Sequence, residues 1–107
     1  MRAQIAVVDP AAAGRPLTMI VTVEIDRRGP QDPAALDRWL AAEPAVQQAW
    51  QVAGDADYTL VVTARDAAGY RVFLRRLVAE NPAVVRCRSG MVLETVKRGL
   101  AVPVEDD

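Results

Sequence analysis

The sequence predicts an α+β fold in which two helices pack on one face of a four-stranded antiparallel sheet, the split-βαβ or ferredoxin-like arrangement. Two observations support it. Apolar residues alternate in four segments and recur every three or four residues in two others, and these segments follow in the order β-α-β-β-α-β. A chain of 107 residues is the length of one domain with a single core.

Two strands are expected before the first helix. Leu17–Asp26 reads as a half-buried strand, because alternate positions collect the apolar residues Leu17, Met19, Val21, Val23 and Ile25 on one face. A shorter strand over Ala3–Val8 precedes it. Between the two, Asp9–Pro16 contains two prolines and a glycine and is expected to be a loop.

The first helix is expected to follow a turn over Arg27–Gln31. Asp32 and Pro33 suit the N-cap and the first turn, and Pro44 marks the end. The spacing of three and four residues predicts an apolar stripe, with Trp39 in the core, made by Leu36, Trp39 and Leu40.

A hairpin is expected next, with strands over Val46–Val52 and Tyr58–Ala64. Gly54 and its two aspartates, Asp55 and Asp57, form the turn, since glycine accepts positive φ and aspartate tolerates turn conformations. Two carboxylates within three positions exceed what a turn requires. Trp50 is expected in the core or at a dimer interface.

The second helix and the last strand complete the pattern. Asp66 is expected to cap the helix, and Asn81-Pro82 to end it. Its apolar face comprises Tyr70, Phe73, Leu74, Leu77 and Val78, and its basic cluster, expected on a solvated face, comprises Arg71, Arg75 and Arg76. The last strand is expected over Val84–Val96, with a possible break at Gly90.

The face of the sheet away from the helices has no cover in this arrangement. It includes apolar residues such as Ile20, Val61 and Val92. Because monomers rarely expose a large apolar surface, the pattern predicts self-association through the sheet.

Composition narrows the function classes. DNA binding requires a concentrated basic surface, and a net charge of −1 does not indicate one. Direct DNA binding by this chain is therefore not expected. Cys87 is the single cysteine and histidine is absent, which excludes an internal disulfide, a Cys/His zinc site and histidine-based catalysis within one chain. No metal or cofactor is expected. No signal-peptide or membrane-spanning stretch is recognisable, so a cytoplasmic location and no membrane partner are expected.

Four short motifs, in order and at matching spacing, point to a family. They are Asp9-Pro10…Gly14, Gly54-Asp55-x-Asp57-Tyr58, Asp66…Tyr70…Leu74 and Val92-Leu93-Glu94-x-Val96-Lys97. With them, nearly the whole chain resembles the C-terminal effector-binding and oligomerisation domain, or RAM domain, of the Lrp/AsnC transcriptional regulators.

The resemblance implies a ferredoxin-like unit that dimerises through its sheet, with dimers assembling further, often to octamers. It implies that a small molecule, usually an amino acid, binds between dimers. The positions that match the family's ligand contacts are Gly54, Asp55, Asp57, Tyr58, Asp66, Cys87 and Ser89. The family commonly has threonine at the last two positions. Ser89 keeps a hydroxyl and Cys87 does not, which implies an altered or lost specificity.

Three segments are expected on this basis: a linking strand and loop over 1–16, the ligand-binding domain over 17–97 and a C-terminal end over 98–107. The helix-turn-helix of the family is not present in this sequence. The chain is therefore expected to be either an excised domain or a stand-alone version that acts as an effector sensor or as a partner of full-length regulators.

Several readings stay open at this point. Asp55 and Asp57 are either solvated turn residues or ligand contacts, Asp66 is a helix cap that is also able to meet a ligand, and Cys87 and Ser89 are either a small buried pair or ligand contacts. Two other functions compete with effector binding: a dimeric enzyme of the ferredoxin-like monooxygenase type, and an oligomerisation domain without a ligand. The first ranks lower because no nucleophile or second general acid accompanies the two aspartates.

Overall fold

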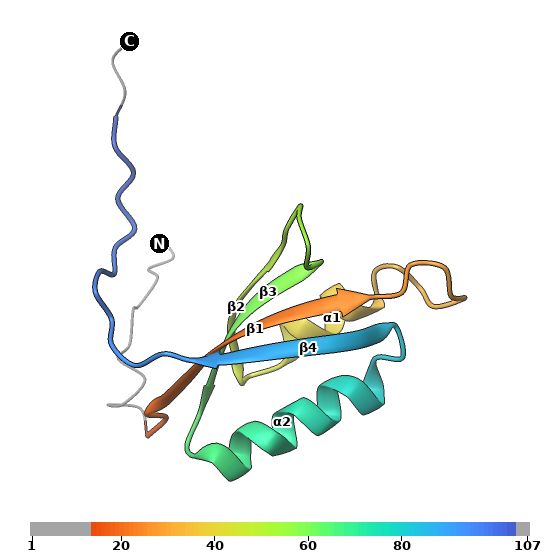
Figure 1. Cartoon of the computed structure of the whole chain (residues 1–107), viewed down its shortest axis with the longest axis horizontal. Helices are drawn as coiled ribbons and strands as arrows, with labels where there is room; N and C mark the ends of the chain where they lie inside the picture. Colours follow the sequence, from red (N-terminus) through yellow and green to blue (C-terminus); the bar gives the residue numbers. More distant parts are fainter. Residues whose placement is uncertain (1–13, 105–107) are drawn as a thin grey trace.

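The computed structural model describes residues 14–104, so the strand expected over Ala3–Val8 lies outside the described residues. Within this part the elements follow the expected order: β1 (Leu17–Ile25), α1 (Ala35–Ala42), β2 (Val46–Gln51), β3 (Tyr58–Ala64), α2 (Ala67–Glu80) and β4 (Val84–Met91). The strands form one antiparallel sheet in the order β2-β3-β1-β4. Both helices lie against the same face of it (Figure 1), which confirms the ferredoxin-like fold.

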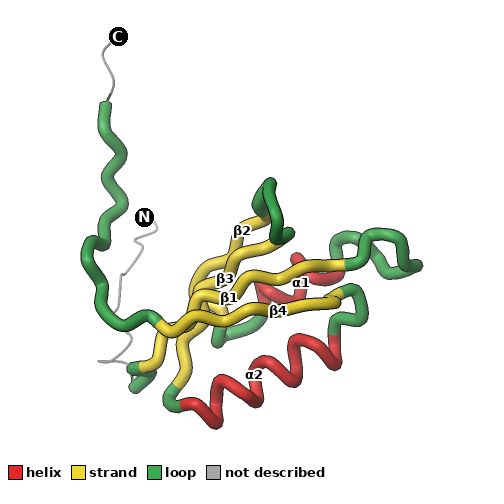
Figure 2. Tube along the Cα trace, in the orientation of Figure 1, coloured by secondary structure: helices red, strands yellow, loops and turns green. Residues whose placement is uncertain are grey.

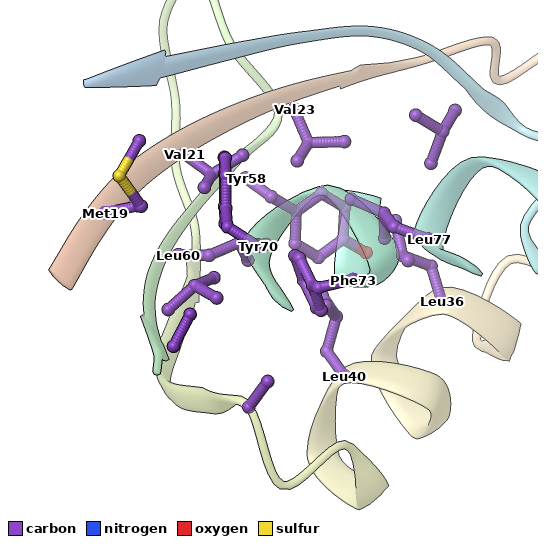
Figure 3. Close-up of a cluster of buried hydrophobic side chains, with 14 residues drawn as sticks. Met19, Val21, Val23, Leu36, Leu40, Tyr58, Leu60, Tyr70, Phe73 and Leu77 are labelled. Atoms are coloured by element: carbon purple, nitrogen blue, oxygen red, sulfur yellow. The ribbon is translucent and has the colours of Figure 1, made fainter. Parts of the chain in front are cut away.

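The core fills the space between the sheet and the helices (Figure 3). The antiparallel register sets Val21 opposite Leu60 and Val23 opposite Tyr58, so their side chains share the face that meets α1 and α2. The largest fully buried side chains are Val21, Val23, Leu60, Val62 and Leu77. Burying one such side chain stabilises the fold by about 1.5–3 kcal/mol, so this layer holds the helices on the sheet.

The opposite face of the sheet carries no helix among the described residues (Figure 2). Ile20 of β1 lies opposite Val61 of β3 and is 38% exposed, while Trp50 of β2 is 47% exposed. Towards β4 the face becomes charged, because Glu24 lies opposite Arg86. The face therefore combines apolar residues with threonines over β1–β3 and is charged where Glu24 meets β4.

The first helix begins later than the sequence suggested. Its N-cap is Ala34, which makes no side-chain cap bond, and the predicted cap Asp32 lies before it. The Asp32 carboxylate accepts the N–H of Ala34 at 2.9 Å, and its carbonyl accepts the N–H of Ala35 at 3.0 Å. Asp32 therefore closes a separate turn ahead of the helix, a role that aspartate performs as readily as capping.

Three strands are shorter than predicted. β1 ends at Ile25 and β2 at Gln51, each one residue early, and β4 ends at Met91 instead of reaching Val96; it pairs through Gly90 without a break. The reason for the early end of β4 is the length of the neighbouring strand. Val92 still donates its N–H to the Thr18 carbonyl at 2.9 Å, but β1 begins at Leu17, so β4 has no further partner.

The basic cluster on α2 is not wholly solvated. Arg71 and Arg75 are exposed as expected, but Arg76 forms an ion pair with the buried carboxylate of Glu43. The Arg76 guanidinium also lies 5.5 Å from the ring centroid of Trp39. Trp39 itself is only half-buried, and its indole N–H donates to Glu80 at 2.7 Å. These contacts join the end of α1 to α2.

No helix in residues 14–104 has the length and apolarity needed to cross a membrane.

Candidate functional site

The turn between β2 and β3 lies at one end of the sheet (Figure 2), and Gly54 and Asp55 are exposed there. Gly54 has a φ of 147°, a conformation that residues with a side chain rarely adopt, so a glycine is required here for its backbone. Asp55 is exposed and makes no ion pair or side-chain hydrogen bond with another residue of 14–104. Its carboxylate is thus available to a ligand.

Asp57, two residues further on, points back into the protein. Its carboxylate accepts the N–H of Ile25 at 2.8 Å and pairs with the guanidinium of Arg27 at 2.8 Å. These two partners, the Ile25 N–H first, hold the pKa of Asp57 below its usual value. The backbone N–H of Asp57 donates to the Val23 carbonyl at 2.9 Å. Asp57 therefore fastens the turn to the end of β1.

Tyr58 begins β3 and reaches from the sheet to α1. Its hydroxyl donates to the carboxylate of Asp37, which also accepts the side-chain amide of Gln51 at 2.9 Å. Burial of the phenol and the neighbouring Asp37 raise the pKa of Tyr58 to about 12. Tyr58 is only 5% exposed, so its ring belongs to the core and its hydroxyl links two elements.

A cleft of about 500 Å³ opens beside this hydrogen-bonded group. Its walls come from the segment between β1 and α1, from α1 itself, and from Gln51 and Tyr58. Arg27 and Asp37 line it with opposite charges. The sequence did not identify either residue, because each is brought to the turn by strand register or helix packing and neither lies in a local motif.

Asp66 lies at the other end of β3. Its carboxylate accepts the N–H of Gly69 at 2.8 Å and caps α2, as predicted. It lines a separate cleft of about 650 Å³ together with Arg15, Glu43 and Arg65. The seven residues of β3 separate Asp66 from the turn. A strand rises about 3.3 Å per residue, so the two places are roughly 20 Å apart.

Cys87 and Ser89 lie on the helix-facing side of β4, opposite Val23 and Val21 of β1. Cys87 is half-buried and packs against the core, and burial raises the pKa of its thiol. The Ser89 hydroxyl is hydrogen-bonded to the hydroxyl of Tyr70 on α2. Neither residue lines the cleft beside the turn or the one beside Asp66.

The predicted site residues therefore occupy three places in one chain. Gly54, Asp55, Asp57 and Tyr58 are together, Asp66 is at the opposite end of the sheet, and Cys87 and Ser89 are between β4 and α2. A free amino acid is far shorter than the distance between the first two places. No group of three or more Cys, Asp or Glu side chains suited to a metal ion occurs within residues 14–104.

Comparison with known proteins gives a consistent result. Residues 18–102 match the family described as the Lrp/AsnC ligand binding domain. The chain is 35% identical over 105 residues to an uncharacterised HTH-type transcriptional regulator, y4tD, of Sinorhizobium fredii, covering 98% of this chain and 62% of that protein. It is 30% identical over 94 residues to an uncharacterised HTH-type regulator of Haemophilus influenzae, of which it covers 56%. The chain thus spans about three fifths of these relatives.

Solved structures share the fold. An AsnC family transcriptional regulator from Agrobacterium tumefaciens superposes with a TM-score of 0.83 at 23% identity, over 96% of this chain and 67% of that one. A regulator from Neisseria meningitidis, solved as a complex with L-methionine, gives 0.80 at 21% identity over 96% and 66%. The feast or famine regulatory protein of Mycobacterium tuberculosis, complexed with L-methionine, gives 0.75 at 26% identity over 88% and 61%.

Proposed function

Because this chain belongs to the Lrp/AsnC ligand-binding domain family of transcriptional regulators, we propose that it senses an amino acid and converts binding into a change of assembly. The effector binds between copies of the chain, at the turn Gly54–Tyr58. Two relatives of known structure were solved with L-methionine, which supports an amino acid as the ligand class. Regulation of transcription then runs through a DNA-binding domain or a full-length regulator, in the cytoplasm, and this chain does not grip DNA itself.

The observation that carries the proposal is the exposed carboxylate of Asp55 on a turn that Asp57 holds rigid. An α-ammonium group needs acceptors, which a carboxylate supplies, and an α-carboxylate needs donors, which backbone N–H groups around a glycine turn supply. A turn fixed before binding also loses little conformational entropy when a ligand arrives.

The separation of the predicted contacts supports a site shared between copies. Asp66 is roughly 20 Å from the turn along β3, by the rise of a strand, so one small ligand cannot touch both in one chain. A turn from one copy and the α2 N-terminus of another are able to meet at a contact between dimers. The dimer itself is proposed to form by stacking the open faces of two sheets, where Ile20 and Trp50 are exposed.

Calorimetry and thermal shift with the twenty amino acids and related metabolites test the proposal. A ligand at a hundred times its Kd stabilises the folded protein by about 2.7 kcal/mol. We expect one amino acid to raise the melting temperature, Asp55→Ala to weaken its binding, and Arg75→Ala, a change of an exposed residue on α2, to leave it unchanged. Light scattering with the ligand is expected to show a shift in oligomer size. A panel without any shift or heat would leave only the oligomerisation role.

A further inference from the structure

The segment that follows β4 exposes an unusual amount of apolar surface. We propose that residues 92–104, here called the tail, add as an extra strand to the outer edge of β2 in a second copy of the chain. This is an interface at the edge of the sheet, separate from the stacking of sheet faces and from effector binding.

The tail makes few contacts with its own domain. Figure 1 shows it running away from the sheet and the helices after β4. Its large apolar side chains are almost fully solvated: Leu93 is 91% exposed, Val96 93%, Leu100 72%, Val102 79% and Val104 91%. Soluble proteins rarely leave so many such residues together in water, so this surface needs a partner. The family match extends to residue 102, so most of the tail belongs to the matched domain.

β2 offers the complementary surface. It pairs only with β3 among the described residues, so its other side presents unpaired backbone donors and acceptors. Its residues after Val46 are all exposed. A groove of about 380 Å³ runs beside it, with an apolar lining from Leu40 and Ala41 of α1 and from Val46 and Ala49 of β2. An extended peptide binds such an edge through main-chain hydrogen bonds and places alternate side chains in the adjoining groove.

The sequence of the tail fits this role position by position. Leu100, Val102 and Val104 alternate, so in a strand their side chains share one face and their backbone N–H groups point to one side. Pro103 has no N–H. It lies at one of the alternate positions, whose backbone N–H groups would point away from the partner, so the missing donor is not needed for pairing. The tail is thus able to donate every backbone bond towards β2 while its three apolar side chains enter the groove.

The occupant of the groove is a second copy because of where the tail starts. The hydrogen bond from Val92 to Thr18 holds its first residue beside β1, on the β4 side of the sheet. β2 is the opposite edge, beyond β1 and β3. The tail would have to cross the ends of both strands to reach its own β2, whereas the β2 of a neighbouring copy has no such barrier.

Hydrogen exchange of the full-length chain tests the backbone pairing. Moving the proline by one position, in the double variant V102P/P103V, keeps the composition and removes the donor that faces β2. We expect the amides of 46–51 to exchange about tenfold faster or more in this variant than in the wild type, with β1 unchanged as evidence of an intact fold. P103A is the matched control, because it changes a position whose backbone N–H points away from β2. It is expected to leave the exchange of the β2 amides as slow as in the wild type.

Cysteine pairing identifies the occupant. With Cys87→Ala removing the native thiol, a chain carrying Val102→Cys is mixed with a chain carrying Ala49→Cys under mild oxidation. A mixed disulfide dimer is expected to dominate over the product formed with Arg71→Cys, which places the thiol on the exposed side of α2. The proposal is wrong if Ala49→Cys and Arg71→Cys react equally, if one chain carrying both Ala49→Cys and Val102→Cys closes on itself, or if the proline shift leaves β2 exchange unchanged.

Discussion

The carboxylate of Asp57 accepts the backbone N–H of Ile25 at 2.8 Å, so the turn between β2 and β3 is fastened to the end of β1. Asp55, only two residues away, is exposed. The two aspartates look equivalent in the sequence and have different tasks in the fold. Asp57 holds the shape of the turn, and Asp55 is the carboxylate that a ligand is able to reach.

This difference predicts that one alanine substitution lowers stability and the other does not. Asp57→Ala leaves the Ile25 N–H and the Arg27 guanidinium without their acceptor. Loss of a hydrogen bond to a charged group costs about 1.5–3 kcal/mol, and partial exposure of Asp57 places the expected loss towards the lower end. Urea denaturation of both variants measures it. Asp55→Ala is the matched control and is expected to unfold at the wild-type urea concentration; equal losses would contradict the assignment.

The same contact predicts a dependence of stability on pH. The pKa of Asp57 is lowered in the folded protein by the Ile25 N–H and then by Arg27. A lowered pKa means that the stabilisation is complete above the unfolded value of about 3.9 and is lost as the pH falls through the lower folded value. The difference in unfolding free energy between the wild type and Asp57→Asn is therefore expected to be constant from pH 7 to 5 and to shrink below about pH 4. A difference that grows on acidification would contradict it.

The fold could be predicted from the sequence because the spacing of the apolar residues indicates which face of each helix or strand is buried. Val21, Val23 and Leu77 are fully buried, as their positions in the pattern predicted. The ends of elements were less accessible. The length of β4 depends on where β1 begins, and the start of α1 depends on the turn that Asp32 closes, so neither can be read from the segment itself.

The candidate site was only partly accessible. The turn was located by its glycine and aspartates, and Asp66 was correctly identified as a cap. The sequence could not show that the Asp57 carboxylate accepts hydrogen bonds from the Ile25 N–H and the Arg27 guanidinium. These residues are about thirty positions away and are brought close only by strand pairing in the sheet. The pairing of Arg76 with Glu43 was missed for the same reason: helical periodicity places Arg76 on the polar side of α2 and says nothing about the neighbouring α1.

Glu43 provides a third prediction, at the junction of the two helices. Its buried carboxylate accepts the N–H of Ala45 at 3.1 Å and pairs with Arg76. Glu43→Ala leaves the buried Ala45 N–H without an acceptor, a loss that costs about 1–3 kcal/mol. Thermal unfolding is expected to show a lower melting temperature for Glu43→Ala than for Arg75→Ala, which changes an exposed charged residue. Equal melting temperatures would mean that the junction does not contribute to stability.

Tyr58 provides the last prediction, because its pKa reports both burial and the contact with Asp37. The chain has two tyrosines, so Tyr70→Phe leaves Tyr58 as the only phenol that ionises. Absorbance near 295 nm is expected to titrate with a pKa of about 12. An exposed tyrosine titrates near 10, so the folded value is raised over the unfolded one. The contribution of the buried Tyr58 phenol to the free energy of unfolding is therefore fully present below about pH 10. It is lost as the pH rises towards 12.

Asp37→Asn separates the two causes of this shift. The substitution removes the negative charge beside the phenol but leaves the ring buried. Since burial is the larger cause, the pKa of Tyr58 is expected to fall in this variant and to stay above about 10. Gln51→Ala keeps the charge of Asp37 in place but removes a donor to both Asp37 and the Tyr58 hydroxyl. Because the Gln51 contact lowers the pKa of Tyr58, this control is expected not to lower that pKa. If Tyr58 titrated near 10 in the Tyr70→Phe protein while the fold was intact, its link to α1 would not exist, and the wall that it gives to the cleft beside the turn would have to be redrawn.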